Sequence, residues 1–212
     1  MILSDSGNTS FEQPPTGSHV GRCISIIDLG TQRTTYEGEA QIKHQVILRW
    51  ELSNELMESG EHVGKPFTVS RFYTASLHEK SGLRKDLASW RGRDFTPEEL
   101  KGFDLQSIIG KPCMLAVGLS EKGKAKVTSV MGLPKGMNVS PQVNPSFHFT
   151  LDAKEYTDDK FESLSKGFKA MVEASPEYQA IQRKKHAPDK KIALQLTSAG
   201  SGFDDMDDDV PF

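Results

Sequence analysis

Aromatic and basic side chains recur along this chain at spacings that would place them on a common surface, where they could bind nucleic acid. The run PFTVSRFYT (66–74) alternates as a β-strand does, and one of its faces holds Thr68, Ser70 and Phe72. An aromatic ring on a face of Thr and Ser has no obvious core partner, whereas every nucleic-acid base has a flat face on which a ring can stack. We therefore expect Phe72 to be the leading base-stacking residue.

Two basic residues of the run QIKHQVILRWELS (41–53) are candidates for phosphate contacts. The alternation places Lys43 and Arg49 on the face expected to be exposed, and Trp50 on the opposite, apolar face. The same alternation is expected if Lys43 and Arg49 are only charged residues of a solvent-exposed face. Phosphate binding is therefore one of two interpretations. Trp50 is predicted to lie in the core.

The other candidates lie in a loop, a helix and a hairpin. Tyr36 falls in the predicted loop 31–40, which would flank a binding cleft, or would pack on the rim of the fold. The basic residues of the predicted helix 78–90 alternate with acids and could instead form ion pairs on a solvated helix face. Lys124 and Lys126 share one side of a strand and could follow a phosphate backbone. The full set expected to bind comprises Tyr36, Lys43, Arg49, Arg71, Phe72, Tyr73, Arg84, Lys85, Lys122, Lys124 and Lys126.

These residues must be positioned by short β-strands and one helix. Strands are expected at 19–29, 41–53, 66–74, 112–119 and 124–131, with helix 78–90 and a short helix from Pro97 between the third and fourth strands. This is the element order of an OB-fold, a five-stranded Greek-key barrel with a helix between strands three and four. The prediction is a mainly β fold of that type, although an SH3-like barrel or another α+β domain could contain the same runs.

The chain divides into four parts by composition. We expect a flexible N-terminus (1–17), a barrel domain (18–135), a linker with a helical extension (136–197) and a disordered acidic tail (198–212). The extension carries an apolar helical stripe that includes Phe161, Leu164 and Phe168. We expect this stripe to pack on the barrel or on a second protomer, with docking to a partner as the alternative.

Composition excludes several classes of protein. The two cysteines lie outside any CxxC pair, and the six histidines form no metal-binding spacing, so neither a metal site nor a cofactor is expected. No nucleophile or P-loop motif is present, and we do not expect an enzyme. No stretch is apolar enough to span a membrane and no signal peptide is evident, which favours the cytoplasm, that of a bacterial host if the gene is carried by a phage.

Charge is unevenly distributed along the chain. Residues 18–135 hold 17 basic and 14 acidic residues, whereas residues 201–212 hold five aspartates and no base. A mildly basic body suits an anionic ligand, and the acidic end could compete with that ligand for the same surface. The last three residues are apolar, which a solubilising tail does not require, so we expect another protein to supply a pocket for them.

The sequence FDDMDDDVPF at the end of the chain resembles the C-terminal tip of bacterial single-stranded DNA-binding proteins. In that family an acidic run ends in Asp-Asp-Ile/Leu-Pro-Phe, and valine replaces Ile or Leu here. The tip docks replication and repair proteins in that family. The resemblance implies the same use for Asp207, Asp208, Asp209, Val210, Pro211 and Phe212.

The stretch RFYTASLHEKSGLRKDLASWRGRDFT (71–96) resembles phage-encoded single-stranded DNA-binding proteins of the OB class. The glutamine- and glycine-rich linker of the bacterial proteins is missing. We expect a protein that coats single-stranded DNA without sequence preference and recruits replication, recombination and repair partners. The alternatives are an annealing or recombination-mediator protein and a docking adaptor that binds no DNA. The sequence is compatible with either a monomer or a homo-oligomer.

Overall fold

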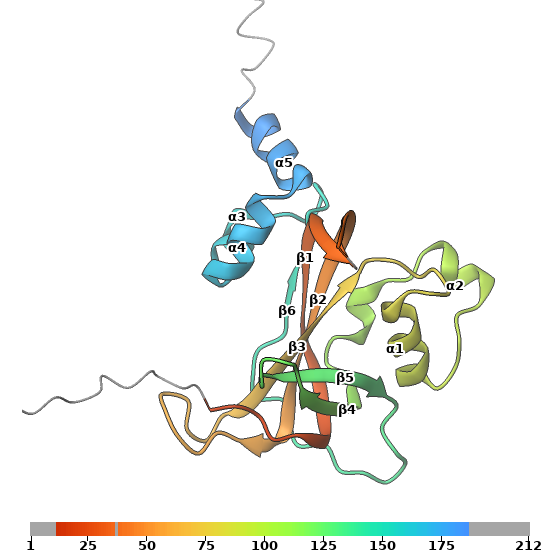
Figure 1. The fold of residues 1–212 in the computed structure, drawn as a ribbon, viewed down its shortest axis with the longest axis vertical. Coiled ribbons are helices and arrows are strands. Elements are labelled where there is room, and N and C mark those ends of the chain that lie inside the picture. The colour runs from red at the N-terminus through yellow and green to blue at the C-terminus, as the bar shows by residue number, and fades with distance from the viewer. Residues whose placement is uncertain (1–11, 37, 187–212) are drawn as a thin grey trace, which may run out of the picture.

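The computed structural model describes residues 12–36 and 38–186. Its main element is a sheet of five antiparallel strands in the order β3-β2-β1-β4-β5, with a short sixth strand parallel to β1 (Figure 1). The strands are β1 (Gly17–Tyr36), β2 (Glu39–Leu56), β3 (Pro66–Thr74), β4 (Pro112–Leu119), β5 (Ala125–Met131) and β6 (Phe147–Phe149). The helices are α1 (Gly82–Arg91), α2 (Pro97–Lys101), the 3-10 helix η1 (Leu105–Ile108), α3 (Asp158–Glu162), α4 (Lys166–Glu173) and α5 (Pro176–His186). The prediction of a mainly β fold is confirmed.

The first two strands are longer than the sequence predicted. Gly30 was expected to end the first strand, but β1 continues through it with a left-handed backbone (φ 69°) at a register irregularity between Asp28 and Gly30. A bulge of this kind bends a strand without ending its pairing. The expected loop 31–40 is therefore the tip of a β1–β2 hairpin, and Tyr36 ends a strand instead of lying in a loop.

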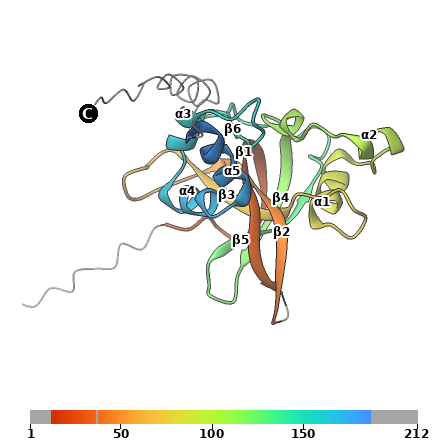
Figure 2. The ribbon, with the colours of Figure 1, turned by 90° about the horizontal axis from the view of Figure 1, so that it is seen from above.

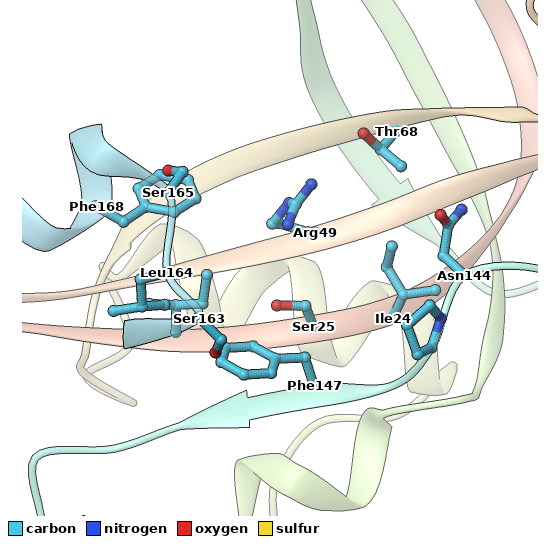
Figure 3. Close-up of a pocket in the computed structure, with 12 residues that line it drawn as sticks. Ile24, Ser25, Arg49, Thr68, Asn144, Phe147, Ser163, Leu164, Ser165 and Phe168 are labelled. Carbon is cyan, nitrogen blue, oxygen red and sulfur yellow. The ribbon is translucent and has the colours of Figure 1, made fainter. Parts of the chain in front are cut away.

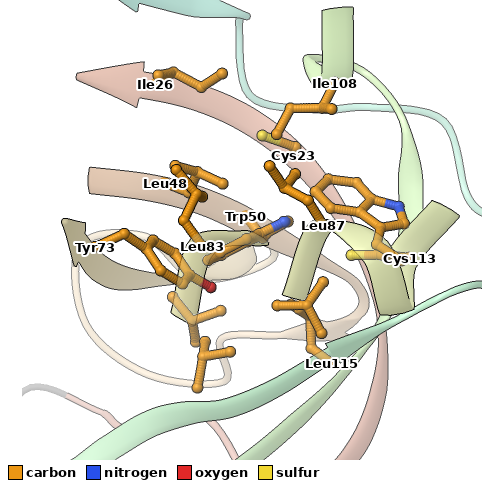
Figure 4. Close-up of a cluster of buried hydrophobic side chains, with 14 of the residues drawn as sticks. Cys23, Ile26, Leu48, Trp50, Tyr73, Leu83, Leu87, Ile108, Cys113 and Leu115 are labelled. Atoms are coloured by element: carbon orange, nitrogen blue, oxygen red, sulfur yellow. The ribbon is translucent and has the colours of Figure 1, made fainter. Parts of the chain in front are cut away.

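The main hydrophobic core lies between the sheet and α1. Leu83, Leu87 and Trp90 of α1 are buried, as their i, i+4, i+7 spacing predicted. The rings of Trp90 and Trp50 lie with their centroids 6.4 Å apart, and Trp50 is fully buried (Figure 4). The predicted core position of Trp50 is confirmed.

A second hydrophobic core lies on the other face of β1 and β2. Ile27, Leu29 and Ile47 meet Phe149 and the helical extension there. Figure 2 shows α3, α4 and α5 on one side of the sheet and α1 and α2 on the other. The apolar stripe of the extension is thus buried within the chain, as expected for packing on the strands, and much of the face expected to be solvated is covered.

Glu51 fixes the segment that leads to this second core. Its carboxylate accepts hydrogen bonds from the backbone N–H groups of Val143 (3.1 Å) and Asn144 (2.9 Å) and from Asn144 Nδ2 (2.9 Å). The side chain is 0% exposed, although it alternates in step with Lys43 and Arg49, whose face was expected to be exposed. Glu51 can be buried because these amide groups satisfy its carboxylate.

The N-terminal boundary also differs from the expectation. Gly17 already belongs to β1, and Glu12, in the part expected to be flexible, accepts a hydrogen bond of 2.8 Å from the backbone N–H of Ser59. Its carboxylate also accepts one from the backbone N–H of Glu58 (3.0 Å). Residues 12–17 are therefore tied to the turn that follows β2.

The two edge strands of the sheet approach each other. Arg71 Nη1 on β3 donates a hydrogen bond of 2.9 Å to the carbonyl oxygen of Thr128 on β5. No backbone ladder joins β3 to β5 in the described part of the chain, so the sheet is curved but not closed. Among the described helices, none has the length and apolar character needed to cross a membrane.

Candidate nucleic-acid interface

A shallow groove of about 450 Å³ follows the seam between β3 and β5. Its lining comes from both strands and, among the residues that the structure describes, contains no acidic residue. The lining residues are Ser70, Arg71, Phe72, Lys126, Val127 and Thr128. Three residues predicted from the sequence to bind nucleic acid, Arg71, Phe72 and Lys126, are thereby brought into one groove.

Phe72 is the exposed aromatic side chain of this groove. Thr68, Ser70 and Phe72 alternate on β3 with the buried residues Phe67 and Val69. The ring of Phe72 is 47% exposed, as the sequence predicted. A half-exposed ring beside polar side chains can receive a base, and this stacking role stays a prediction.

Lys126 supplies the available positive charge of the groove. Its side chain is exposed on β5, and no ion pair to it is found within residues 12–36 and 38–186. Lys122 and Lys124 are exposed in the turn before β5, which begins at Ala125, one residue later than expected. The three lysines form a basic edge that leads from the β4–β5 turn to the groove.

Arg71 is held by the protein itself. Its guanidinium lies 2.9 Å from Asp86 Oδ2 and 5.2 Å from the ring centroid of Tyr73, in addition to its bond to Thr128. The Nη1 group therefore joins β3, α1 and β5, and Asp86 balances the charge of the guanidinium. Its main role is structural, and its contribution to an anionic ligand is reduced.

Tyr73 lies in the core and not in the groove, which corrects the expectation of an exposed, DNA-contacting side chain. The side chain is 5% exposed, and its hydroxyl donates a hydrogen bond of 2.7 Å to Asp86. Burial, with the nearby Asp86 carboxylate, raises the pKa of the Tyr73 hydroxyl well above its usual value. The cause is the strand period of two, because Tyr73 shares its face with the core residues Phe67 and Val69.

Most of the basic residues around α1 form ion pairs with acidic residues, which was the alternative to nucleic-acid binding for this helix. Arg84 lies 2.9 Å from Asp94, and its hydrogen bond to that carboxylate raises the pKa of the guanidinium. Arg91 and Arg93 both meet Glu99, and the hydrogen bond from Arg93 is the main cause that lowers the pKa of Glu99 to about 2. These pairs link the helix to the following loop, so Arg84 is better explained as structural.

The remaining predicted residues lie outside the groove. Lys85 is exposed on α1, and Lys43 is exposed on β2. Arg49 is half-buried on β2, beneath the helical extension, because that extension covers a face expected to be open. Tyr36 is placed only by its backbone, at the end of β1.

One residue of the groove was not predicted from the sequence, and one predicted set of residues cannot be placed. Sequence reasoning missed Thr128, which lines the groove and binds Arg71, although its position two residues after Lys126 on β5 is the signal that could have found it. The docking residues 207–212 lie outside the described residues.

No cluster of three or more His, Cys, Asp or Glu that could hold a metal ion occurs among the residues that the structure describes. No protein-family model matches the sequence, and a search of curated proteins finds no significant relative.

Proposed function

We propose that the protein binds single-stranded DNA without sequence preference through the groove between β3 and β5. The observation that carries the proposal is that the exposed Phe72 ring and Lys126 line one groove, where the described residues give Lys126 no ion pair and include no acid in the lining. Nonspecific single-strand binders combine such stacking rings with cations that follow the backbone. A duplex keeps its bases stacked on each other, so the ring favours single strands.

The arrangement of strands supports an OB-type barrel as the framework. β1 pairs with both β2 and β4, α1 lies between β3 and β4 in sequence, and β3 and β5 approach each other at the seam. In an OB-fold the second and third strands and the loops beside them form the binding face. The groove includes the third strand, which agrees with that position.

Binding would be an equilibrium process driven by two terms. The lysines of the β4–β5 edge displace counterions from phosphates, and Phe72 stacks on a base. The C-terminal tip would recruit replication, recombination or repair proteins by its apolar end and its aspartates. This second role is supported by the sequence motif alone.

Substitution of the stacking ring tests the proposal. Phe72→Ala should weaken binding to a mixed-sequence single strand by about 1–3 kcal/mol, while Phe72→Tyr should retain most of it. Val63→Ala is the matched control, since Val63 is also an exposed apolar residue and lies outside the groove. The measurement is fluorescence anisotropy with a labelled oligonucleotide. Equal affinities for Phe72→Ala and the wild type would refute the role of the groove.

A further inference from the structure

A second pocket, of about 290 Å³, lies on the outer face of the sheet beneath the start of α4. It shares no lining residue with the β3–β5 groove. Arg49 and Ser25 project into it from adjacent strands, and Ser163 and Ser165 come from the turn before α4 (Figure 3). The pocket therefore forms only because the helical extension packs on the sheet.

Among the residues that the structure describes, Arg49 is the only charged one that lines this pocket. Its guanidinium has no hydrogen bond or ion pair to any group in the described part of the chain, and its burial lowers its pKa. Other arginines of the fold, such as Arg71 and Arg84, are each paired with a carboxylate. Because an unpaired buried charge is costly, a half-buried arginine without an anion indicates that a ligand supplies one.

Ser25 is a second unsatisfied group at the same place. Its side chain is 2% exposed, and its Oγ has no hydrogen-bond partner within residues 12–36 and 38–186. Ser25 is the register partner of Arg49 across β1 and β2, so the two side chains are direct cross-strand neighbours. Buried hydroxyls are rarely left unpaired, and this one lies where a ligand of Arg49 would lie.

The start of α4 faces the pocket from the opposite side. This helix has eight residues, its N-cap is Ser165, and the Ser165 side chain makes no capping hydrogen bond. The first turn contains no acidic residue. The free N–H groups at a helix start carry partial positive charge and bind anions well.

We propose that this pocket binds a phosphate group, with Arg49, the Ser25 hydroxyl and the first N–H groups of α4 as donors. Phosphate suits the site because it has several acceptor oxygens, which donors approaching from the sheet and from the helix can share. The guanidinium fork can bind two of these oxygens at once.

The phosphate can come from the DNA backbone or from a free phosphate compound. Thr68 lines the pocket and Ser70 lines the groove, and the two are successive outward residues of β3, about 7 Å apart. A strand that occupies the groove can therefore reach the pocket with its backbone. The assignment to the DNA backbone rests on the proposed function, whereas phosphate binding itself does not.

The test is an NMR titration of the full-length protein with inorganic phosphate at constant ionic strength, with chloride as the reference anion. The arginine side-chain Nε–H signals are followed. The signal of Arg49 should shift and saturate, and Ser25→Ala should weaken the binding. Arg33→Met is the control, since Arg33 is exposed on β1 and lines neither pocket. An Arg49 signal that moves no more with phosphate than with chloride would overturn the proposal.

A second measurement separates the two sources of phosphate. If the pocket takes a backbone phosphate, Arg49→Met should reduce the slope of log K against log salt for single-stranded DNA by about 0.7, while Arg33→Met should not. An unchanged slope, together with saturable phosphate binding, would assign the pocket to a free phosphate compound. If the wild type binds phosphate but no DNA, the pocket stands and the proposed function fails.

Discussion

Two adjacent aromatic residues of β3 show how strand geometry decides which side chain is exposed and which is buried. Phe72 faces the groove with a half-exposed ring, whereas Tyr73 faces the core and is hydrogen-bonded to Asp86. Both are aromatic, and both were expected to contact DNA. Residue type alone therefore does not decide the role, because the side of the strand determines whether a ring meets solvent or α1.

Removal of the Tyr73 hydroxyl should affect stability and not binding. Tyr73→Phe deletes the hydrogen bond to Asp86 and should lower the free energy of unfolding by about 1–3 kcal/mol, because the acceptor is charged and partly buried. Urea denaturation measures the loss, and DNA affinity should remain that of the wild type. A stable variant with weakened binding would place this hydroxyl in the interface.

At the scale of elements, a polar clasp holds α5 to the β1–β2 hairpin. His44 Nε2 lies 2.6 Å from Asp28 Oδ1, and His44 Nδ1 lies 3.6 Å from Glu177 Oε1 at the start of α5. Glu177 also accepts two hydrogen bonds from Thr31. The backbone N–H of Thr31 donates one of 2.9 Å, and the Thr31 hydroxyl donates one of 2.5 Å. The clasp joins β1 and β2 to α5, which lies more than a hundred residues later in the sequence.

Each ionisable group of the clasp has a shifted pKa. The hydrogen bond to Asp28 is the main cause that raises the pKa of His44. Burial by itself would raise the pKa values of Asp28 and Glu177, but hydrogen bonds from His44 and Gly30 to Asp28, and from Thr31 to Glu177, lower both. The charged forms of all three groups are therefore favoured in the folded protein.

The stability contributed by the clasp should depend on pH in both directions. Because the pKa of His44 is higher in the folded than in the unfolded protein, its charge contributes fully to the free energy of unfolding below the unfolded-state pKa. That contribution is lost as pH rises through the folded-state pKa. The lowered pKa values mean that the carboxylate contributions are lost as pH falls through the folded values. The free energy of unfolding of the wild type should thus exceed that of His44→Gln near pH 5.5, and the difference should shrink towards about pH 8.

Urea denaturation across that range checks the prediction. His62→Gln is a control, since His62 is exposed in the β2–β3 turn. A difference between wild type and His44→Gln that stays constant with pH would show that His44 contributes only by packing.

Several elements could be predicted from the sequence because their patterns are local. The alternation of 66–74 and the helical spacing of Leu83, Leu87 and Trp90 each follow from a single period. The burial of Glu51 and Arg49 could not be predicted, because it results from the extension that packs on β2 from more than ninety positions away. Strand alternation identifies two faces, but only the tertiary fold decides which of them is covered.

At the scale of the whole molecule, the sheet carries an apolar core on each face, and the proposed binding surface is what remains open. The helical extension covers β1 and the central part of β2, so the outward residues of β3 lie between the covered part and the β5 edge. A strand of DNA that follows β3 would pass from the Arg49 pocket to the groove. If DNA binds as proposed, the extension would limit the direction in which it crosses the sheet.

The acidic tail is expected to compete with DNA for this basic surface. Removal of residues 204–212 deletes five aspartates and should leave the affinity for single-stranded DNA unchanged or raise it at low salt. A full-length variant with these aspartates changed to asparagine separates the effect of charge from that of length. Anisotropy gives both affinities, and weaker binding by the shortened chain would contradict competition.

The most direct test of the account is the binding of the wild-type protein to single-stranded DNA across a salt series. A labelled mixed-sequence strand of about 30 nucleotides is long enough for an OB-type site. We predict tight binding at low salt, a linear decrease of log K with log salt at about 0.7 per phosphate contact, and little competition from the matching duplex. The absence of binding at low salt, or equal competition by the duplex, would contradict it and would favour a docking adaptor.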